Sequence, residues 1–236
     1  MKKLYIFKVG ETFESTKKLL GDFDAWVAQC ISSNLLVETI DILAQEELPP
    51  FESVLGVIIT GSHSMVTDEE TWSLKTEKWI SQAQEHSINI LGICYGHQLI
   101  AKALGGRSDY NPKGKEIGSV TILTNSAKEN DPLFKDAPDT FFANVTHMQS
   151  VLSLPEGAQI LGYNEHDKHQ IVRYTPNIWG VQFHPEYTIT IIQEYIKEQA
   201  DELIALGFSP QKLLKDVMQT HYANSLIESF AKMLSK

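Results

Sequence analysis

Residues 90–98, Ile-Leu-Gly-Ile-Cys-Tyr-Gly-His-Gln, combine a nucleophilic side chain with a backbone pattern that could expose it. An apolar run ends in a Gly-x-Cys-x-Gly turn, and a helical pattern follows directly. Glycine is expected on both sides of Cys94 because so tight a turn brings those positions close together, where a Cβ would clash. The thiol would lie at a helix N-terminus, whose positive dipole end and free N–H groups favour a thiolate. The pattern therefore predicts a nucleophilic cysteine.

A second segment, residues 179–186 (Trp-Gly-Val-Gln-Phe-His-Pro-Glu), supplies an imidazole and a carboxylate. Side chains of a strand alternate between its faces, so Gln182, His184 and Glu186 would share one face. The Glu186 carboxylate could then orient the His184 imidazole. Pro185 is tolerable only at a strand end or edge, which predicts a position at the rim of the sheet. Thiol, imidazole and carboxylate are the parts of a nucleophilic triad, whose imidazole takes the thiol proton and later protonates a leaving amine.

The elements that must position these motifs alternate between strand and helix in the first half of the chain. This alternation predicts a mostly parallel sheet covered by helices on both faces. Residues 3–9 alternate as in an edge strand, whereas the β-branched run 54–60 is typical of a strand buried on both faces. We expect strands at 3–9, 36–42, 54–60 and 89–93, helices at 14–33, 68–86 and 95–104, and a turn at 61–64.

The second half changes to strands with short connections, which predicts antiparallel pairs. His166-Asp167-Lys168-His169 reads as a hairpin turn, and the pattern is helical from Thr188 onward, broken at 207–210. No repeat, low-complexity stretch or linker interrupts the chain, so we expect one domain over residues 1–236. The strands expected here are 117–123, 141–145, 158–163, 170–174 and 178–183.

Composition excludes several classes of protein. The 236 residues are 42% hydrophobic and 21% charged, which argues against disordered and fibrous classes. The net charge is -10 and no Lys/Arg-rich run stands out, so a nucleic-acid partner is not expected. No apolar run approaches the ~20 residues that span a membrane. Two cysteines are too few for a disulfide scaffold, and we expect a reduced, cytoplasmic protein in which Cys30 is a small buried hydrophobe.

The motif Gly-Ile-Cys-Tyr-Gly-His-Gln, with Gln-Phe-His-Pro-Glu downstream and Thr-Gly-Ser upstream, resembles the class I (triad-type) glutamine amidotransferases. The match spans roughly residues 54–187, and within the family the chain most resembles stand-alone relatives of the glutaminase domain of GMP synthase. The resemblance implies a flavodoxin-like, three-layer α/β fold with a mostly parallel central sheet and C-terminal helices. It also implies hydrolysis of the glutamine side-chain amide through a γ-glutamyl thioester, which releases ammonia.

Residue by residue, the resemblance makes Cys94 the nucleophile, His184 the acid and base, and Glu186 its orienting group. It implies that Gly61 and Tyr95 offer backbone N–H groups to the oxyanion of the tetrahedral intermediate. No cofactor or metal is implied. The residues that the resemblance places against the substrate are Gly61, Ser62, Tyr95, Gln98, His147 and Met148.

Two departures from the family pattern leave the substrate open. The loop Gly61-Ser62-His63-Ser64 stands where many relatives carry Gly-Gly-Pro or Gly-Ser-Pro. His147-Met148-Gln149 stands where GMP synthase-like members carry His-Gly-Asp, so an acidic residue that could hold the α-amino group is missing. A γ-glutamyl peptidase or hydrolase acting on a γ-glutamyl conjugate is therefore the alternative enzyme. A non-catalytic regulatory subunit is the alternative outside enzymes.

The partners follow from what the chain lacks. No synthase domain or Walker-type phosphate loop is found in 236 residues, so any ammonia would pass to a separate synthetase subunit. The apolar stripe of the C-terminal helices is expected to pack on the sheet, and part of it could form a homodimer.

His63 and His147 could line the pocket or lie on surface loops. His166 and His169 have the spacing of a metal pair but occupy a polar turn without a nearby cysteine, so no metal site is predicted.

Overall fold

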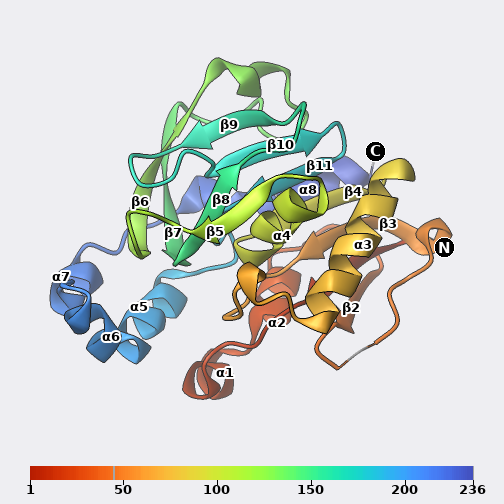
Figure 1. Cartoon of the computed structure of the whole chain (residues 1–236). Helices are drawn as coiled ribbons and strands as arrows, with labels where there is room; N and C mark the ends of the chain where they lie inside the picture. Colours follow the sequence, from red (N-terminus) through yellow and green to blue (C-terminus); the bar gives the residue numbers. More distant parts are fainter. Residues whose placement is uncertain (45, 236) are drawn as a thin grey trace.

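The computed structural model describes residues 1–44 and 46–235 and is built around a mixed nine-stranded sheet in the order β2-β1-β3-β4-β11-β10-β9-β6-β7 (Figure 1). The first five strands are parallel, and the remaining four pair antiparallel. The large-sheet strands are β1 (Lys3–Lys8), β2 (Val37–Asp41), β3 (Val54–Ile59), β4 (Asn89–Ile93), β6 (Glu116–Thr124), β7 (Thr140–His147), β9 (Gln159–Tyr163), β10 (Ile171–Thr175) and β11 (Ile178–Val181).

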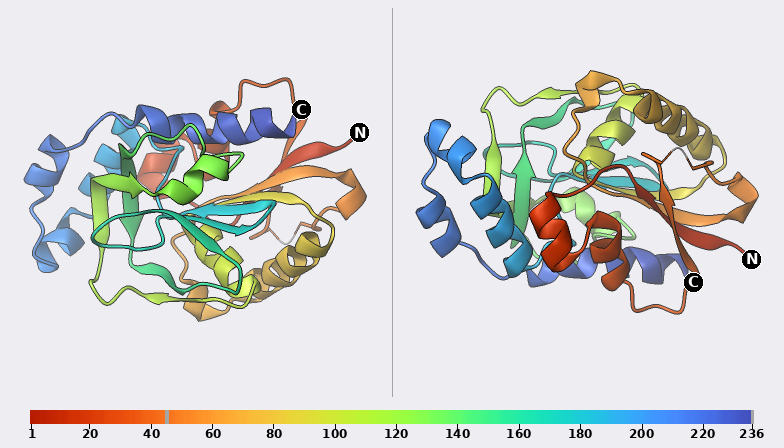
Figure 2. Two further views of the ribbon diagram at one scale, coloured as in Figure 1. Left: turned by 90° about the horizontal axis from the view of Figure 1, so that it is seen from above. Right: turned by 90° about the horizontal axis from the view of Figure 1, so that it is seen from below.

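Helices cover both faces of the sheet and give three layers (Figure 2). One face packs a core with α2 and α8, and the other packs a core with α3 and α4. A third apolar cluster lies under α5. The helices are α1 (Glu14–Leu20), α2 (Phe23–Gln29), α3 (Thr71–Glu85), α4 (Tyr95–Ala103), α5 (Ile189–Glu198), α6 (Ala200–Ala205), α7 (Pro210–Lys215) and α8 (His221–Leu234). This arrangement confirms the predicted fold class.

The first strand corrects one prediction. Residues 3–9 were expected at an edge, but β1 lies between β2 and β3 and is buried along most of its length. Its alternation is weak because both faces of an interior parallel strand are covered by helices. The edge strand is β2, whose first three residues are exposed.

The predicted helix 14–33 was also wrong, because it is two helices. Gly21 has φ 89°, which ends α1, and the Asp22 carboxylate accepts from the Phe23 N–H to start α2. The break turns Leu19 outward, where 67% of its surface is exposed. Cys30 follows α2 and is partly exposed rather than buried, although it packs against the core.

The second half follows the expected pattern with one addition. The turn at 166–169 joins the antiparallel strands β9 and β10, as predicted. Two short strands that were not predicted, β5 (Arg107–Tyr110) and β8 (Gln149–Ser153), form a separate two-stranded sheet. After Thr188, whose hydroxyl caps α5, the chain is helical with the expected break before Pro210. No helix within residues 1–44 and 46–235 is long and apolar enough to cross a membrane.

Candidate active site

Cys94 lies in a sharp turn between β4 and α4, where its backbone adopts φ 50° and ψ -100°. The flanking glycines are required by contact, as predicted. A Cβ on Gly92 would lie 2.6 Å from the carbonyl carbon of Gly96, and a Cβ on Gly96 would lie 2.6 Å from the Ile59 carbonyl oxygen. Backbone in this sparsely populated region costs energy and is held by its surroundings. The turn therefore presents the thiol at the N-terminus of α4.

The neighbouring strands hold this turn in place. Because β3, β4 and β11 are parallel, their carboxyl ends meet at one edge of the sheet. The Cys94 N–H donates to the Val181 carbonyl at 2.8 Å, and the Gly96 N–H donates to the Thr60 carbonyl at 3.3 Å. The turn is thus tied to the strand on each side, and the segment after β11 is brought beside the thiol.

His184 and Glu186 form a buried pair next to the thiol. The His184 Nδ1 atom lies 2.7 Å from the Glu186 Oε1 atom, and both side chains are almost fully buried. The prediction placed them on one face of a strand, but β11 ends at Val181 and the pair is made in the turn that follows. The His184 N–H donates to the Asn144 carbonyl at 2.8 Å, which fixes that turn against β7.

Two aromatic rings lie nearly parallel to the ring of His184. Tyr187 stacks on it with a centroid separation of 4.1 Å, and Phe23 lies at 6.3 Å with nearly parallel planes. A Cβ on Gly61 would come within 2.8 Å of the His184 Cε1 atom. Only glycine therefore fits at position 61 while the imidazole keeps this place.

The pKa of His184 follows from its charged neighbours. Burial alone would lower it, but the charges of Glu186 and Cys94 raise the pKa to about 10. The imidazole is therefore positive at neutral pH.

The thiol and imidazole are close but not hydrogen-bonded to each other. The Cys94 Sγ atom lies 3.8 Å from the Thr146 carbonyl, toward which it donates. Among the described residues, the buried Nε2 atom of His184 has no hydrogen-bond partner. This nitrogen is the atom that would exchange a proton with the sulfur or with a leaving group. Catalytic hydrogen bonds are often long before a substrate binds.

Two backbone donors flank the site, because Tyr95 follows Cys94 directly and Gly61 packs against His184. Gly61 follows β3 and Tyr95 opens α4. In residues 1–44 and 46–235, the N–H groups of Gly61 and Tyr95 donate to no other group of the protein. Free N–H groups next to a nucleophile are the usual form of an oxyanion hole. The geometry accommodates the role that the resemblance implied for them.

Gln182 is a contact of the thiol that was not predicted as a site residue. Its Nε2 atom donates to the Cys94 Sγ atom at 3.5 Å, and its Oε1 atom accepts from Gln98 at 3.1 Å. Gln98 also donates to the Gln149 carbonyl at 2.7 Å. The signal was present in the sequence, because Gln182 was expected on the same face as His184.

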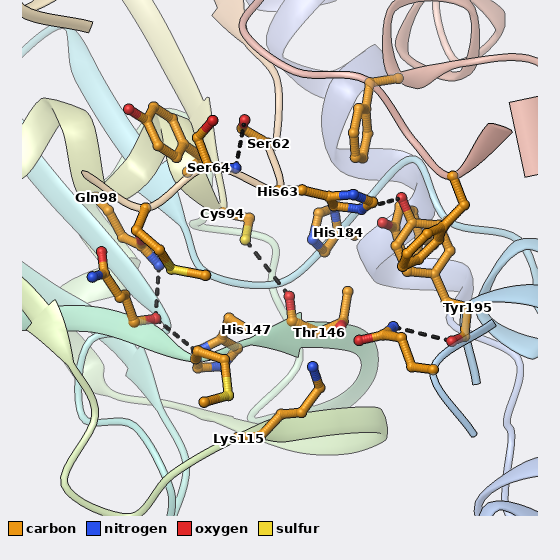
Figure 3. A pocket seen from close by; sticks show the side chains of 18 of the residues that line it. Ser62, His63, Ser64, Cys94, Gln98, Lys115, Thr146, His147, His184 and Tyr195 are labelled. Carbon is orange, nitrogen blue, oxygen red and sulfur yellow. Dashed lines mark hydrogen bonds between the residues drawn. The ribbon is translucent and has the colours of Figure 1, made fainter. Parts of the chain in front are cut away.

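A pocket of about 250 Å³ surrounds Cys94 (Figure 3). Of the predicted residues, Cys94, His184, Ser62, Tyr95, Gln98, His147 and Met148 line it. Gly61 and Glu186 do not line the pocket, but both pack against His184. The remaining lining residues are Phe13, Phe23, His63, Ser64, Met65, Lys115, Thr146, Gln149, Tyr187, Tyr195, Gln199 and Glu202.

His147 belongs to a buried polar network behind the pocket. Its Nε2 atom lies 2.9 Å from a carboxylate oxygen of Glu116, which also accepts from Asn164 and Gln170. Burial opposes both charges, yet each partner stabilises the other, so the pKa of His147 is raised and that of Glu116 is lowered. His147 is thus a buried residue at the end of β7, paired with Glu116, rather than part of a surface loop.

Gln149 and the His166/His169 pair are used structurally. The Gln149 side chain accepts from the Val66 N–H at 3.0 Å and donates to the Thr67 hydroxyl at 2.6 Å. His166 and His169 contact separate carbonyl oxygens, those of Gly114 and Val151. No group of three or more His, Cys, Asp or Glu side chains that could hold a metal occurs in the part of the chain that the structure describes.

Comparison with solved structures supports the fold. A glutamine amidotransferase from Thermotoga maritima superposes with a TM-score of 0.78 and 22% identity, covering 100% of both chains. A glutamine amido transferase from Methylobacillus flagellatus gives a TM-score of 0.77 and 20% identity over 100% of this chain and 93% of the other.

Comparison of sequences identifies the family. Gamma-glutamyl peptidase 4 of Arabidopsis thaliana is 28% identical over 81% of this chain and 74% of its own length. A glutamine-hydrolyzing GMP synthase subunit of Methanocaldococcus jannaschii is 34% identical over 68% of this chain and 78% of its own length. The profile of the glutamine amidotransferase class-I family matches residues 27–203. The protein with the Cys94 turn and the His184–Glu186 pair therefore belongs to the class I glutamine amidotransferase family.

Proposed function

We propose that this protein hydrolyses a γ-glutamyl amide, with glutamine as the simplest substrate, through a thioester on Cys94. The observation that carries the proposal is a pocket lined by Cys94, Tyr95 and His184, in which Glu186 and Gly61 pack against the His184 ring from outside the lining. Both kinds of relative named above, a peptidase and an amidotransferase subunit, support an amide-cleaving enzyme.

The proposed reaction begins with attack of the Cys94 thiolate on the γ-carbonyl carbon. The Gly61 and Tyr95 N–H groups stabilise the oxyanion, and one such donor is typically worth about 3 kcal/mol. His184 donates its proton to the departing nitrogen as the C–N bond breaks, which leaves a γ-glutamyl thioester. His184 then takes a proton from water, the hydroxide adds to the thioester, and glutamate and the free thiol are released.

The amino-acid end of the substrate is proposed to lie on the side of Cys94 where Gln98, His147 and Met148 line the pocket (Figure 3). The family's acidic residue is replaced by Gln149, whose side chain is occupied by the 66–67 loop. The pocket instead contains an ion pair in which Lys115 Nζ lies 3.0 Å from Glu202 Oε1. We infer that Glu202 takes over the contact with the α-ammonium group and Lys115 the contact with the α-carboxylate.

The fate of the released amine separates two forms of the proposal. If glutamine is the substrate, the ammonia would pass to a separate synthetase partner, and the likeness to a subunit of GMP synthase supports this form. If a γ-glutamyl conjugate is the substrate, no acceptor is needed, and the likeness to a γ-glutamyl peptidase supports this second candidate. Gln149 in place of the family's acidic residue changes how the α-amino group of the substrate is held. This change supports a γ-glutamyl conjugate as the second candidate substrate.

The experiment compares the wild type with Cys94→Ala on glutamine and on a panel of γ-glutamyl amines, with glutamate release as the readout. Release from glutamine supports the amidotransferase form, and release only from conjugates supports the peptidase form. If neither the protein alone nor the protein with cell extract shows Cys94-dependent release, both forms are wrong and a regulatory role remains. Co-purification of a synthetase that raises glutamine turnover would identify the acceptor.

A further inference from the structure

The pocket continues past His184 into a wall of aromatic rings. This aromatic wall consists of Phe13, Phe23, His63, Tyr187 and Tyr195, all of which line the pocket. Together with His184 the rings close a circuit in which each lies between 4.1 and 6.3 Å from the next, centroid to centroid. The wall is assembled from four separate segments of the chain: the 9–13 loop, α2, the loop after β3, and residues 187–195.

The aromatic wall lies on the side of the pocket that the leaving group of the substrate would occupy. The leaving nitrogen must lie beside the Nε2 atom of His184, which is buried and has no partner among the described residues. Whatever is bonded to that nitrogen continues away from Cys94 on the His184 side. Figure 3 shows His63 and Tyr195 on this side and Gln98 on the other. The aromatic wall therefore borders the leaving group and not the glutamyl group.

The wall carries no net charge. The Tyr195 hydroxyl contacts Thr12 at 2.7 Å and His63 at 3.2 Å, so its polar atom is already paired. Desolvation of the His63 ring by the surrounding pocket, followed by the positive charges of His184 and Lys115, lowers the pKa of His63 to about 4. The imidazole is thus neutral at pH 7.

The pocket is also larger than glutamine requires. Its volume of about 250 Å³ is roughly twenty times what one water molecule needs, whereas glutamine has ten non-hydrogen atoms. Ammonia as a leaving group would leave the accessible part of the wall, which is formed by Phe13 and His63, in contact with water, because Phe23, Tyr187 and Tyr195 are already at most 1% exposed. A larger, apolar amine would cover it.

Resting on the proposed hydrolysis, we propose that the natural substrate is a γ-glutamyl amide whose leaving amine carries an uncharged aromatic group, seated on the aromatic wall. Aromatic rings pack edge-to-face or offset against such a surface and gain more than their buried area alone. The reaction is the same: the C–N bond breaks, His184 protonates the amine, and glutamate and the arylalkyl amine leave the pocket.

The test uses three probes: L-glutamine, γ-L-glutamyl methylamide and γ-L-glutamyl benzylamide. We expect wild-type kcat/KM to be at least about ten-fold higher for the benzylamide than for the methylamide, since even one methylene in an apolar pocket is worth that much. Calorimetry with Cys94→Ala, which cannot turn over, should show the same preference in Kd.

Two variants locate the preference. Phe13→Ala removes a partly buried ring of the wall, and Phe142→Ala removes an exposed ring on β7, outside the pocket. We expect Phe13→Ala to reduce the benzylamide preference by about ten-fold, and Phe142→Ala to change neither this preference nor glutamine turnover. His63→Ala serves as a second wall variant if Phe13→Ala unfolds.

The outcomes separate this inference from the proposed hydrolysis. If Cys94→Ala binds the two amides equally, or both wall variants weaken all three probes alike, the leaving-group assignment is overturned even though glutamate is still released. If the benzylamide is bound selectively but no probe is cleaved, the wall is a binding site and the proposed hydrolysis is wrong.

Discussion

The side-chain amide of Gln182 donates to the sulfur of Cys94 at 3.5 Å, although the two residues are 88 positions apart in the chain. The contact exists because β11 lies beside β4 and ends level with the Cys94 turn. A hydrogen-bond donor aimed at the sulfur would stabilise the negative charge that the sulfur carries when it attacks or leaves as a thiolate. Gln182 also receives a hydrogen bond from Gln98, so it links the thiol to the first turn of α4.

Gln182→Leu should therefore slow the reaction without unfolding the protein. We expect kcat/KM to fall between about two- and ten-fold, which corresponds to the ~0.5–1.5 kcal/mol of one hydrogen bond. Gln159→Leu, an exposed position on β9, is the matched control and should keep full activity. An unchanged rate in Gln182→Leu would show that this contact has no part in the reactivity of the thiol.

Glu186→Gln should remove the negative charge that stabilises the protonated imidazole of His184. The pKa of His184 is about 10 because the charges of Glu186 and Cys94 outweigh its burial, and the amide removes the first of these charges. We expect kcat to fall by roughly 10²–10⁴, the loss seen when the carboxylate of a triad becomes an amide. Iodoacetamide labelling of Cys94 near neutral pH should slow as well. Labelling is best done in a Cys30→Ala background, because Cys30 is a second, partly exposed thiol.

The same variant gives a stability test with a defined sign. A histidine whose folded pKa is raised contributes stability that is complete below pH 6.5 and is lost as the pH rises toward about 10. The free energy of unfolding of the wild type should thus decrease over this interval, and the decrease should be smaller in Glu186→Gln. Urea titrations at several pH values measure both slopes. Parallel slopes would contradict the assigned charge on His184.

The site was largely predictable because its signals are local. The Gly-x-Cys-x-Gly turn specifies its own geometry, since Gly92 and Gly96 must approach each other whatever surrounds them. The His184–Glu186 pair is two positions apart, so it needs no knowledge of the fold to be found. By contrast, the Gln182 contact and the aromatic wall depend on which strands and loops become neighbours, and spacing along the chain carries no such information.

The errors in the fold have physical causes as well. The strand β5, with the sequence Arg-Ser-Asp-Tyr, has little apolar character, and it exists because β8 offers it a backbone partner. The helix expected at 14–33 overlooked Gly21-Asp22, a helix end followed by an N-cap, because the apolar spacing continued across it. Strand β1 was expected at an edge because residues 3–9 alternate, but one of the polar residues in that pattern, Lys8, is buried against the carboxylate of Asp22.

Gly61→Ala should abolish most activity while the fold is retained. The new Cβ would lie 2.8 Å from the His184 Cε1 atom, so either the imidazole or the Gly61 loop must move. A displacement of about 1 Å at the reacting groups typically costs 10²-fold in rate. Gly162→Ala is a matched control, because its Cβ would lie 2.6 Å from the Ile171 Cδ1 atom, away from the site. Both variants should lose some stability, but only Gly61→Ala should lose about 10²-fold in kcat; equal activities would show that the Gly61 contact is irrelevant to catalysis.

Glu116→Gln should destabilise the fold more than other changes of a polar residue near the pocket, because Glu116 holds His147 in place beside Met148. Its buried carboxylate accepts hydrogen bonds from His147, Asn164 and Gln170 at 2.7 to 2.9 Å. In Glu116→Gln an amide N–H₂ group would face at least one of these donors, and the positive charge of His147 would lose its partner. Breaking a buried pair in this way typically costs about 3–5 kcal/mol.

The pH dependence of the stability lost in Glu116→Gln shows whether the Glu116–His147 pair acts through its charges or through packing. The pKa of Glu116 is lowered, so its contribution to stability is present above pH 4.5 and is lost as the pH falls through the folded-state pKa. The pKa of His147 is raised, so its contribution is complete below pH 6.5 and is lost as the pH rises. The stability difference between wild type and Glu116→Gln should therefore be largest between these limits and shrink on either side. Glu38→Gln, which removes an exposed ion pair with Lys3, should change the stability little, because solvent screens such pairs. A pH-independent difference for Glu116→Gln would show that shape, and not charge, holds His147 against the pocket.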